Sequence, residues 1–418
     1  MKKIILLIFV AILFLTFTTA YSQWILQNSG TTSGLYNVCF TDENTGTVVG
    51  VDGLILRTTN GGTNWNIQPS GTSAQLWDVC FVNANTGTVV GDGGIILRTT
   101  NGGTNWFTQI PDTSETLTGV HFVNANTGTA VGGISSPATI TILRTTNGGT
   151  NWFTQIPDTS GALMKVHFIN ANTGTAVGGW FSPFYSIISR TTNGGVNWNY
   201  QPSGTTDFLY DVSFIDVNTG TAVGAGGTIL RTTNGGTNWI SQTSGTYADL
   251  FGVSFTDTNT GTTVGRNGTI LRTTNGGAIW TIQISGTSSW LNGVSFTDAN
   301  TGTAVGENGT ILRTTNGGVV SFIKQISSEI PERFVLYQSY PNPFNPSANI
   351  KFDITKSSYV KIIVYNSLGK EVTTLVNEKL STGSYDVSWD GSSYASGVYF
   401  YKLTADDFSA TKKMILTK

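Results

Sequence analysis

One hexapeptide, Arg-Thr-Thr-Asn-Gly-Gly, occurs seven times in this chain of 418 residues. Its asparagines are residues 60, 101, 147, 193, 234, 275 and 316, so successive copies are 41 or 46 residues apart. A period near 40 that persists over most of a chain is typical of a solenoid or a propeller, in which each copy is one structural unit. The repeat therefore limits the fold before any single residue is considered.

Each repeat unit favours four short antiparallel strands. Aligned on its tryptophan, the unit reads W-x-x-Q, S-G-T, L-x-x-V-x-F, N-T-G-T-x-V-G and G-x-I-L-R-T-T-N-G-G-T-N. β-Branched and aromatic runs alternate with Gly and Asn turns, without helical periodicity. In the first unit, strands are expected at 35–40, 46–50, 54–59 and 65–68. Seven such units predict an all-β, seven-bladed β-propeller over residues 23–325.

The ends of the repeat region predict how the ring closes. Six hexapeptides precede a tryptophan with Gln three residues later, but the seventh has Ser321 at that place. The missing W-x-x-Q is found near the N-terminus, at Trp24 and Gln27. We therefore expect the N-terminal strand to complete the last blade, which removes an exposed sheet edge. Segment 319–325 is the competing candidate for the same place.

The hexapeptide and its surroundings resemble a known hairpin. T-x-N-G-G-x-N-W is similar to the Asp-box (BNR) motif, S/T-x-D-x-G-x-x-W, with Asn60 in place of Asp. The whole unit resembles the repeats of photosystem II assembly-factor-like and sortilin-like propellers, and this implies the fold rather than a function. Thr58 and Asn60 are expected to bond turn backbone while glycines supply positive φ. We interpret the motif as scaffolding.

The first 22 residues predict a secretory signal peptide. Lys2 and Lys3 precede an apolar run from Ile4 to Phe17, and small residues follow at Ala20 and Ser22. An uncleaved anchor is the alternative, but the run is shorter than the roughly 20 residues a spanning helix needs. No later segment is long and apolar enough to span a bilayer, so we expect no transmembrane segment after signal cleavage. Nucleic acid is not expected as a partner, because the net charge is −2.

The composition changes after Gln325, where the repeat stops and lysines become regular. Residues 326–346 are predicted to be a Pro-rich linker. Alternating runs over 347–418 predict a small immunoglobulin-like β-sandwich. An ordinary adhesion domain of that fold is one interpretation.

This region closely resembles, from about residue 331, the type A C-terminal sorting domain of the type IX secretion system. The matching motifs are Tyr340–Pro346, 364–372, 383–391, 395–403 and the terminal KKMILTK. The resemblance implies that the type IX secretion machinery is a partner. It further implies a protein secreted or held at the outer-membrane surface of a Gram-negative bacterium, with the sorting domain removed on export.

One column of the repeat holds every Cys and His of the chain. Its members are Cys39, Cys80, His121, His167, Ser213, Ser254 and Ser295. Three interpretations are considered: packing between blades, a disulfide between Cys39 and Cys80 in an oxidising compartment, and a Cys₂His₂ metal site. Because these residues are spread one per blade around half a ring, no metal site is expected.

Two five-residue insertions break the repeat in blades three and four. The second contains Trp180, Phe181, Phe184 and Tyr185, four aromatics in a loop that needs none. Exposed aromatics commonly mark a binding surface, so these four are the predicted ligand-binding residues. The alternative is a loop that folds onto the rim and buries its own aromatics.

Catalysis is not predicted. One arginine per blade, beginning with Arg57, invites comparison with the arginine cluster of sialidases, but a repeated arginine is expected to bond carbonyls or cover a tryptophan. Neither the carboxylate pair of a glycosidase nor a Ser-His-Asp arrangement is visible, and no cofactor is implied. The N-T-G segments are interpreted as turns rather than calcium loops.

The sequence therefore predicts a secreted or cell-surface, non-catalytic propeller that binds an unidentified protein or glycan ligand. The alternatives are a sialidase-like carbohydrate-active hydrolase, an assembly-factor-like chaperone and a structural surface protein.

Overall fold

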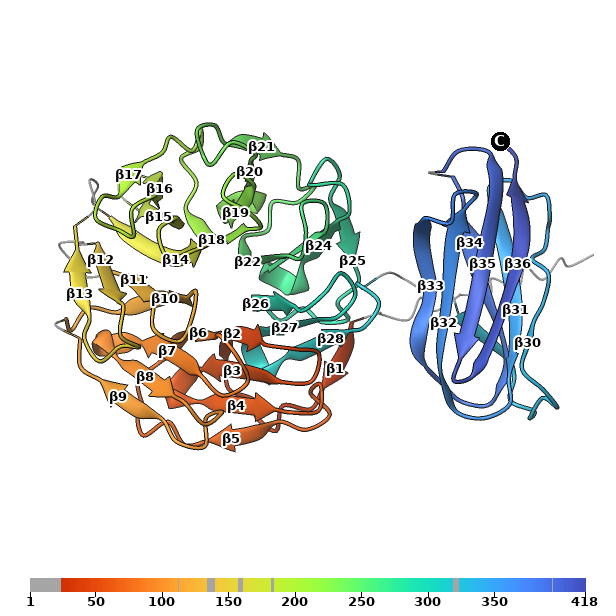
Figure 1. Cartoon of the computed structure of the whole chain (residues 1–418), viewed down its shortest axis with the longest axis horizontal. Coiled ribbons are helices and arrows are strands. Elements are labelled where there is room, and N and C mark those ends of the chain that lie inside the picture. The colour runs from red at the N-terminus through yellow and green to blue at the C-terminus, as the bar shows by residue number, and fades with distance from the viewer. Residues whose placement is uncertain are drawn as a thin grey trace, which may run out of the picture.

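The computed structural model describes residues 24–111, 113–133, 140–156, 161–181, 184–318, 323–392 and 394–418. Figure 1 shows a ring of seven four-stranded sheets and a further body of two four-stranded sheets. The predicted seven-bladed propeller and C-terminal β-sandwich are both confirmed. The predicted signal peptide lies outside the described residues. Within the described ranges, no helix is long and apolar enough to cross a membrane.

Every blade has the same strand order, from the ring axis outward. The innermost strands are β2 (Leu35–Phe40), β6 (Leu76–Phe81), β10 (Leu117–Phe122), β14 (Ala162–Phe168), β18 (Leu209–Phe214), β22 (Leu250–Phe255) and β26 (Leu291–Phe296). The second strands are β3 (Gly46–Gly50), β7 (Gly87–Gly91), β11 (Gly128–Gly132), β15 (Gly174–Phe181), β19 (Gly220–Gly224), β23 (Gly261–Gly265) and β27 (Gly302–Gly306). The third strands are β4 (Ile55–Thr58), β8 (Ile96–Thr99), β12 (Thr141–Thr145), β16 (Phe184–Thr191), β20 (Ile229–Thr232), β24 (Ile270–Thr273) and β28 (Ile311–Thr314).

The outermost strand is short and follows the repeated hexapeptide. Six of these strands are β5 (Asn66–Gln68), β9 (Phe107–Gln109), β13 (Phe153–Gln155), β17 (Asn199–Tyr200), β21 (Ile240–Gln242) and β25 (Thr281–Gln283). In the seventh blade this place is taken by β1 (Ile25–Gln27), which pairs antiparallel with β28. The expectation that the N-terminal strand closes the ring is confirmed. The competing segment does not do so in its described part, because Ile323 pairs with the sandwich instead.

The propeller core lies between blades rather than within them. One buried cluster joins Val49 and Ile55 of the first blade to Leu76, Val79 and Phe81 of the second. An equivalent cluster joins the last blade to the first, and another includes Trp24. Each blade therefore depends on both neighbours for its apolar burial, which makes ring closure a requirement for stability.

The hexapeptide forms the turn that the sequence predicts. The Thr58 hydroxyl accepts the N–H of Gly62 at 2.9 Å, and Asn60 Oδ1 accepts the N–H of Asn64 at 3.0 Å. Gly62 has φ +82°, in the left-handed region that favours glycine, and a Cβ there would lie 2.0 Å from the Gln27 side chain. In the N-T-G turn, Asp42 Oδ1 accepts two backbone N–H groups at 2.8 and 2.9 Å. Both motifs act as scaffolding.

The sandwich consists of two packed sheets. One contains β29 (Ile323–Ser327), β30 (Val335–Leu336), β31 (Ser347–Ile354) and β34 (Gly383–Asp390); the other contains β32 (Ser358–Asn366), β33 (Glu371–Leu380), β35 (Gly397–Ala405) and β36 (Phe408–Leu416). The segment 326–346 was expected to be a linker, but β29 extends into it and β30 lies inside it. Backbone pairing to β34 and β31 recruits these residues into the sandwich.

The two faces of the ring differ in which connections they carry. We call the side where the innermost strands begin the entry face. There, five short 3-10 turns join second to third strands: η1 (Val51–Gly53), η2 (Asp92–Gly94), η3 (Ala225–Gly227), η4 (Arg266–Gly268) and η5 (Glu307–Gly309). The Val51 N–H bonds Gly34 O at 3.1 Å, which fixes η1 beside the start of β2. The N-T-G turns and hexapeptide turns lie on the opposite face.

Candidate functional site

The repeated arginines connect each blade to the next. Arg57 donates through Nη1 to Thr47 Oγ1 at 2.6 Å in its own blade, and through Nη2 to the backbone oxygen of Ala84 in the second blade. Its guanidinium lies 4.7 Å from the Phe81 ring centroid. The last arginine, Arg313, stacks in the same way on Phe40 at 4.8 Å. The expected carbonyl contacts are present, but the covered ring is a phenylalanine of the next blade rather than a tryptophan.

The column that holds every Cys and His also connects blades. Each of six members accepts a hydrogen bond from the innermost strand of the next blade: Cys39 from Phe81 N–H (3.2 Å), Cys80 from Phe122 (3.4 Å), His121 from Phe168 (3.4 Å), Ser213 from Phe255 (3.3 Å), Ser254 from Phe296 (3.2 Å) and Ser295 from Phe40 (3.1 Å). His167 stacks on His121 with ring centroids 4.6 Å apart. The column is therefore structural, and its shared property is an acceptor atom.

Cys39 and Cys80 are free thiols in this structure, which therefore does not contain the disulfide that was one of the three interpretations. Each sulfur faces the backbone of the following blade instead of the other cysteine. Burial raises the pKa of the Cys39 thiol to about 11 and also raises that of Cys80. Among the described residues, no group of three or more His, Cys, Asp and Glu side chains could hold a metal ion.

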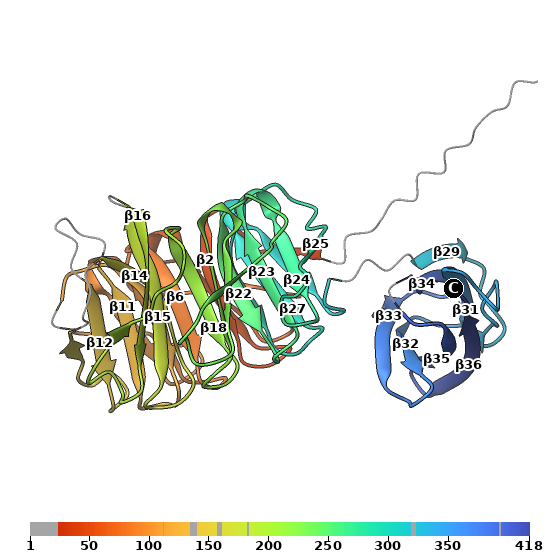
Figure 2. The ribbon, with the colours of Figure 1, turned by 90° about the horizontal axis from the view of Figure 1, so that it is seen from above.

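The predicted binding residues lie on the entry face. In the fourth blade no short turn follows the second strand: β15 and β16 continue as a hairpin in which Trp180 pairs with Tyr185 and Phe181 with Phe184. Ala162, the first residue of β14, pairs with Gly179, so the hairpin extends past the start of the innermost strand. Figure 2 shows β16 at the edge of the ring on this side.

Trp180 and Tyr185 are half-buried, and Tyr185 packs against the apolar cluster that blades three and four share. The side chains of Phe181 and Phe184 lie outside what the structure describes, so ligand binding by these four residues stays a prediction. The insertion of the third blade includes residues 134–139, which lie outside the described residues.

A second group of aromatic residues was missed by sequence reasoning. Each innermost strand has a β-bulge directly after its first leucine, and the bulged residue has no partner in the second strand. The seven bulged residues are Tyr36, Trp77, Thr118, Met164, Tyr210, Phe251 and Asn292. Bulges often redirect side chains beside functional sites. The signal was available, because this position and the one after it vary from blade to blade between a repeated leucine and a repeated valine.

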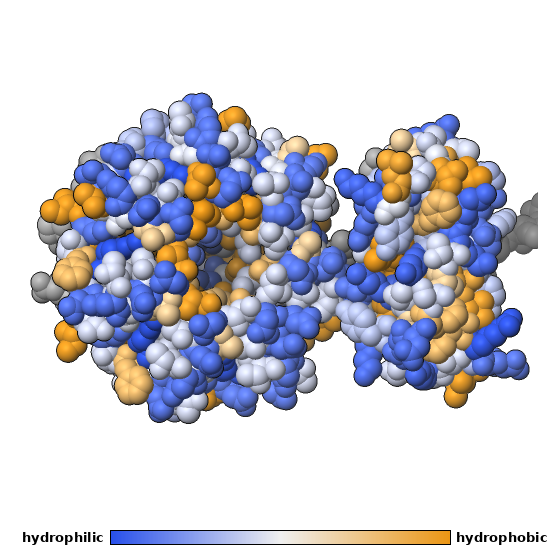
Figure 3. Space-filling model, in the orientation of Figure 1, coloured by the Kyte–Doolittle hydropathy of each residue, from blue (hydrophilic) through white to orange (hydrophobic). Residues whose placement is uncertain are grey.

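Four of the bulged residues form two aromatic arcs together with Trp290. Tyr36 stacks on Trp77 with centroids 4.2 Å apart. Tyr210 and Phe251 lie 5.2 Å apart, and Trp290 lies 5.8 Å from Phe251. All five are half-buried, so part of each ring remains accessible. We call Tyr36, Trp77, Tyr210, Phe251 and Trp290 the aromatic crescent. Figure 3 shows a hollow at the ring axis on the face that is turned to the viewer.

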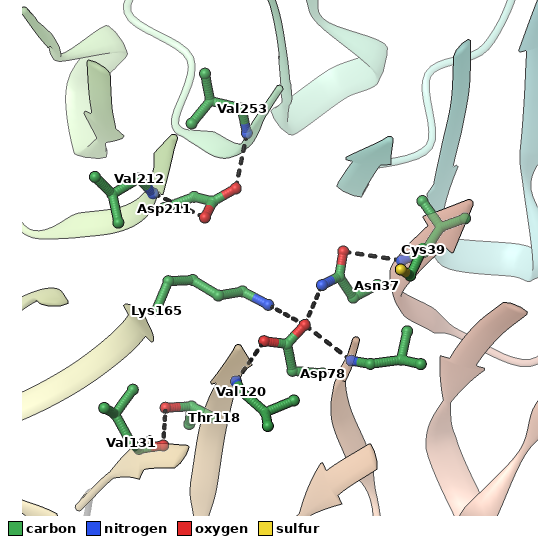
Figure 4. A network of polar contacts seen from close by, with 12 residues as sticks. Asn37, Cys39, Asp78, Thr118, Val120, Val131, Lys165, Asp211, Val212 and Val253 are labelled. Carbon is green, nitrogen blue, oxygen red and sulfur yellow. Dashed lines mark hydrogen bonds and ion pairs between the residues drawn. The ribbon is translucent and has the colours of Figure 1, made fainter. Parts of the chain in front are cut away.

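Polar residues line the channel directly below the crescent. This layer consists of the next residue of each innermost strand: Asn37, Asp78, Gly119, Lys165, Asp211, Gly252 and Gly293. Lys165 forms an ion pair with Asp78 at 2.7 Å, and Asn37 donates to the same carboxylate. Asp78 also accepts the N–H groups of Val79 and Val120, which fixes it between two blades. Figure 4 shows Lys165 extending toward Asp78 from β14.

Asp211 is the second carboxylate of this layer. Its oxygens accept the N–H of Val212 and of Val253, each at 2.8 Å. No ion pair to Asp211 is found in the described part of the chain, and Figure 4 draws no contact from it to Lys165. Burial raises the pKa of this carboxyl to about 6, against the opposing effects of Lys165 and the two N–H groups.

Acidic side chains surround the Tyr36 end of the crescent. Asp52, Asp92 and Glu307 belong to η1, η2 and η5 of three neighbouring blades. Burial, followed by these three carboxylates, raises the pKa of the Tyr36 hydroxyl. Asp92 also accepts the Trp77 indole N–H at 2.6 Å. We call these three residues the acidic rim. The entry face thus combines apolar rings with negative charge, an arrangement suited to recognition.

Comparisons with known proteins agree with this architecture. Residues 17–192 and 189–285 match the profile of the family described as Photosynthesis system II assembly factor YCF48, and 338–417 match the Secretion system C-terminal sorting domain. No curated protein sequence matches the chain.

Solved structures show the same fold at low sequence identity. "YCF48 bound to D1 peptide" is 21% identical, with TM-score 0.59, and the alignment covers 71% of this chain and 96% of that one. YCF48 from Cyanidioschyzon merolae is also 21% identical, with TM-score 0.58 and coverage of 70% and 98%. A GH74 enzyme from Niastella koreensis is 13% identical, with TM-score 0.56 and coverage of 78% and 59%. The family profile covers more than half of the chain, which therefore belongs to the Photosynthesis system II assembly factor YCF48 family and carries a secretion-system C-terminal sorting domain.

Proposed function

We propose that this protein is an exported, non-catalytic recognition module that binds an extended polypeptide at the entry face of its propeller. The observation that carries the proposal is the aromatic crescent around the axial channel. Half-buried aromatic rings supply large contact area and are enriched at binding surfaces. The aromatic crescent, the acidic rim and the blade-four hairpin all depart from sevenfold symmetry on this one face. A family member described as bound to a D1 peptide supports a peptide over other ligands.

We assign the blade-four hairpin to the same surface. The crescent has no aromatic in blades three and four, where the bulged residues are Thr118 and Met164. Blade four instead contributes Trp180, Phe181, Phe184 and Tyr185 beyond the start of its innermost strand. A polypeptide that leaves the channel mouth on that side would continue along this hairpin.

The sorting domain sets where the propeller acts. It directs export, and we propose that the type IX secretion machinery delivers the propeller to the outer-membrane surface of a Gram-negative bacterium. Deletion of residues 338–417 is expected to leave the propeller in the periplasm, as measured by fractionation and immunoblotting. Unchanged surface display of the truncated chain would contradict this route.

Binding is tested with the purified protein on a displayed random-peptide library and a glycan array. The mouth variant Trp77→Ala/Phe251→Ala is expected to lose the selected peptides. A matched control is Phe107→Ala, because Phe107 is 63% exposed on an outermost strand away from the mouth. Trp180→Ala/Phe184→Ala tests the hairpin in the same way.

The possible results of this screen lead to different conclusions about the ligand. Peptides that are bound by the control and lost by the mouth variant support the proposal. Selective glycan binding at the mouth would show that the ligand is a sugar rather than a polypeptide. Release of reducing ends from a bound glycan would favour the hydrolase suggested by the GH74 fold neighbour. Failure to bind any peptide would point to a structural surface role.

A further inference from the structure

The charges on the entry face indicate which kind of polypeptide side chain would bind there. The channel layer below the crescent contains two carboxylates, Asp78 and Asp211, and one ammonium group, Lys165. Lys165 is held by Asp78 at 2.7 Å. The Asp78 side chain is buried, with an exposure of 5%. Its carboxylate already accepts hydrogen bonds from Asn37, Val79 and Val120. One negative charge, that of Asp211, is left without a cationic partner.

Asp211 remains open to a ligand from the channel. The residue is half-buried, in contrast to Asp78. It accepts hydrogen bonds from the backbone N–H groups of Val212 and Val253, one on each oxygen, and each oxygen keeps a further lone pair. The following two blades place Gly252 and Gly293 at the equivalent positions, so no side chain of this layer covers it from that direction.

The surroundings of Asp211 favour a cation. It directly follows Tyr210, and Tyr210 and Phe251 lie 5.2 Å apart. Aromatic faces attract ammonium and guanidinium groups, and the attraction grows when the cation is partly desolvated. The acidic rim of Asp52, Asp92 and Glu307 adds negative electrostatic potential at the channel mouth. A cleft lined by charges of one sign attracts ligands of the opposite charge.

Two positive groups face this region, and each is already engaged. Lys165 is paired as described. Arg266 lies near Tyr210 and Trp290 in the second arc of the crescent, where it pairs with Asp249 at 3.6 Å and stacks on Trp290 at 4.5 Å. The Arg266–Trp290 contact shows, within this chain, that the crescent accepts a guanidinium group on an aromatic face.

We infer, building on the proposed function, that the bound polypeptide presents a lysine or arginine side chain at the channel mouth. The cationic head group pairs with the Asp211 carboxylate, and its aliphatic stem packs against Tyr210 and Phe251. Asp211 is thus the residue that selects for positive charge, while the crescent supplies contact area.

The test selects binders from a phage-displayed library of random 12-residue peptides against three full-length proteins: the unmodified chain, Asp211→Asn and Asp216→Asn. Asn37 occupies the position equivalent to Asp211 and likewise accepts the next N–H at 2.9 Å, so the Asn variant retains the bond from Val212 and loses the one from Val253. Circular dichroism of each protein checks that it is folded. The control Asp216 lies in the N-T-G turn of the same blade on the opposite face. Its carboxylate accepts the Asn218 N–H at 2.7 Å, as Asn83 accepts the equivalent bond at 2.9 Å.

Sequences selected by the unmodified chain and by Asp216→Asn are expected to share a Lys or Arg at one position. Synthetic peptides with that residue changed to Gln should bind at least 10-fold more weakly by fluorescence polarisation. Asp211→Asn should lose both the enrichment and this 10-fold discrimination.

The two proposals fail in different ways. Peptides that need Trp77 and Phe251 but show no basic preference, or keep it with Asp211→Asn, would overturn the cation inference and leave the proposed function standing. Absence of any selected peptide would overturn both.

Discussion

The indole N–H of Trp24 donates a hydrogen bond of 2.8 Å to the side-chain oxygen of Gln283, 259 positions later in the chain. The same bond occurs between neighbouring blades elsewhere in the ring, for example from Trp65 to Gln27 at 3.2 Å. Trp24 therefore takes the place of the tryptophan that the seventh hexapeptide lacks. One residue near the N-terminus completes a contact that six other blades make from within the repeat.

Loss of the closing tryptophan should destabilise the whole ring. Trp24 is 2% exposed and belongs to the apolar cluster between the last two blades. We expect Trp24→Ala to lower the free energy of unfolding by about 3–5 kcal/mol, the usual cost of emptying a buried aromatic site. Urea unfolding followed by circular dichroism measures this. Leu26→Ala, on the same strand and 68% exposed, is the control and should change stability by less than about 0.5 kcal/mol.

The two thiols should be inert in the folded protein. Burial raises their pKa values, and each sulfur accepts a backbone N–H, so little thiolate is available near pH 8. Iodoacetamide should label neither Cys39 nor Cys80 in native buffer and both in urea, as read by intact mass. An intact mass lower than that of the dithiol by two hydrogen atoms, with no labelling in urea, would instead reveal a disulfide in the purified protein.

The acceptor role of the column predicts which replacement is tolerated. Ser213 performs the same bonding as Cys39, so Cys39→Ser should keep stability within about 0.5 kcal/mol of the unmodified chain. Cys39→Val has similar volume but no acceptor, and leaving the Phe81 N–H unpaired should cost about 1–2 kcal/mol. Equal unfolding midpoints for the two variants would refute this role.

The buried histidine pair should weaken the fold as the pH falls. Burial lowers the pKa of His121 to about 4, and burial together with His121 lowers that of His167. Because the unfolded chain binds these protons near pH 6.5 and the folded chain does not, stability is lost as the pH falls from about 6.5 toward 4. His121→Ser/His167→Ser should lose less stability over this interval, measured by urea unfolding at pH 7 and pH 4.5. An identical loss in both proteins would exclude the pair as its cause.

Asp211 should act in the opposite direction over the same interval. Its folded pKa of about 6 lies above the ordinary carboxyl value near 4, so its contribution to stability is present below pH 4 and is lost as the pH rises to 6. The amide of Asp211→Asn keeps the bond from Val212 but leaves the Val253 N–H without its acceptor, which should cost about 1–2 kcal/mol at every pH. The unmodified chain should nevertheless lose stability relative to Asp211→Asn as the pH rises from 4 to 7.5, measured by urea unfolding at both values. A stability difference between the two proteins that is the same at both pH values would exclude Asp211 as the titrating group.

The repeat period and its local chemistry determined the propeller. The alternating runs predicted strands close to β2, β3, β4 and β5. The displaced W-x-x-Q identified Trp24 as the closing residue. Each of these patterns can be recognised from residues within a few positions of one another. The prediction of the sandwich was less complete. Strands β29 and β30 were assigned outside this domain, because their places depend on pairing with β34 and β31 further along the chain.

Only the tertiary structure decided where recognition can take place. In the sequence, Tyr36, Trp77, Tyr210, Phe251 and Trp290 are single aromatics in repeats about 40 residues apart, and Asp211 is one carboxylate among many. Ring closure brings the starts of all innermost strands to one axis. A bulge in four of these strands places Tyr36, Trp77, Tyr210 and Phe251 at the channel mouth, beside Trp290 and Asp211. Sequence periodicity specifies what every blade shares, whereas a site built from one residue per blade exists only once the ring is closed.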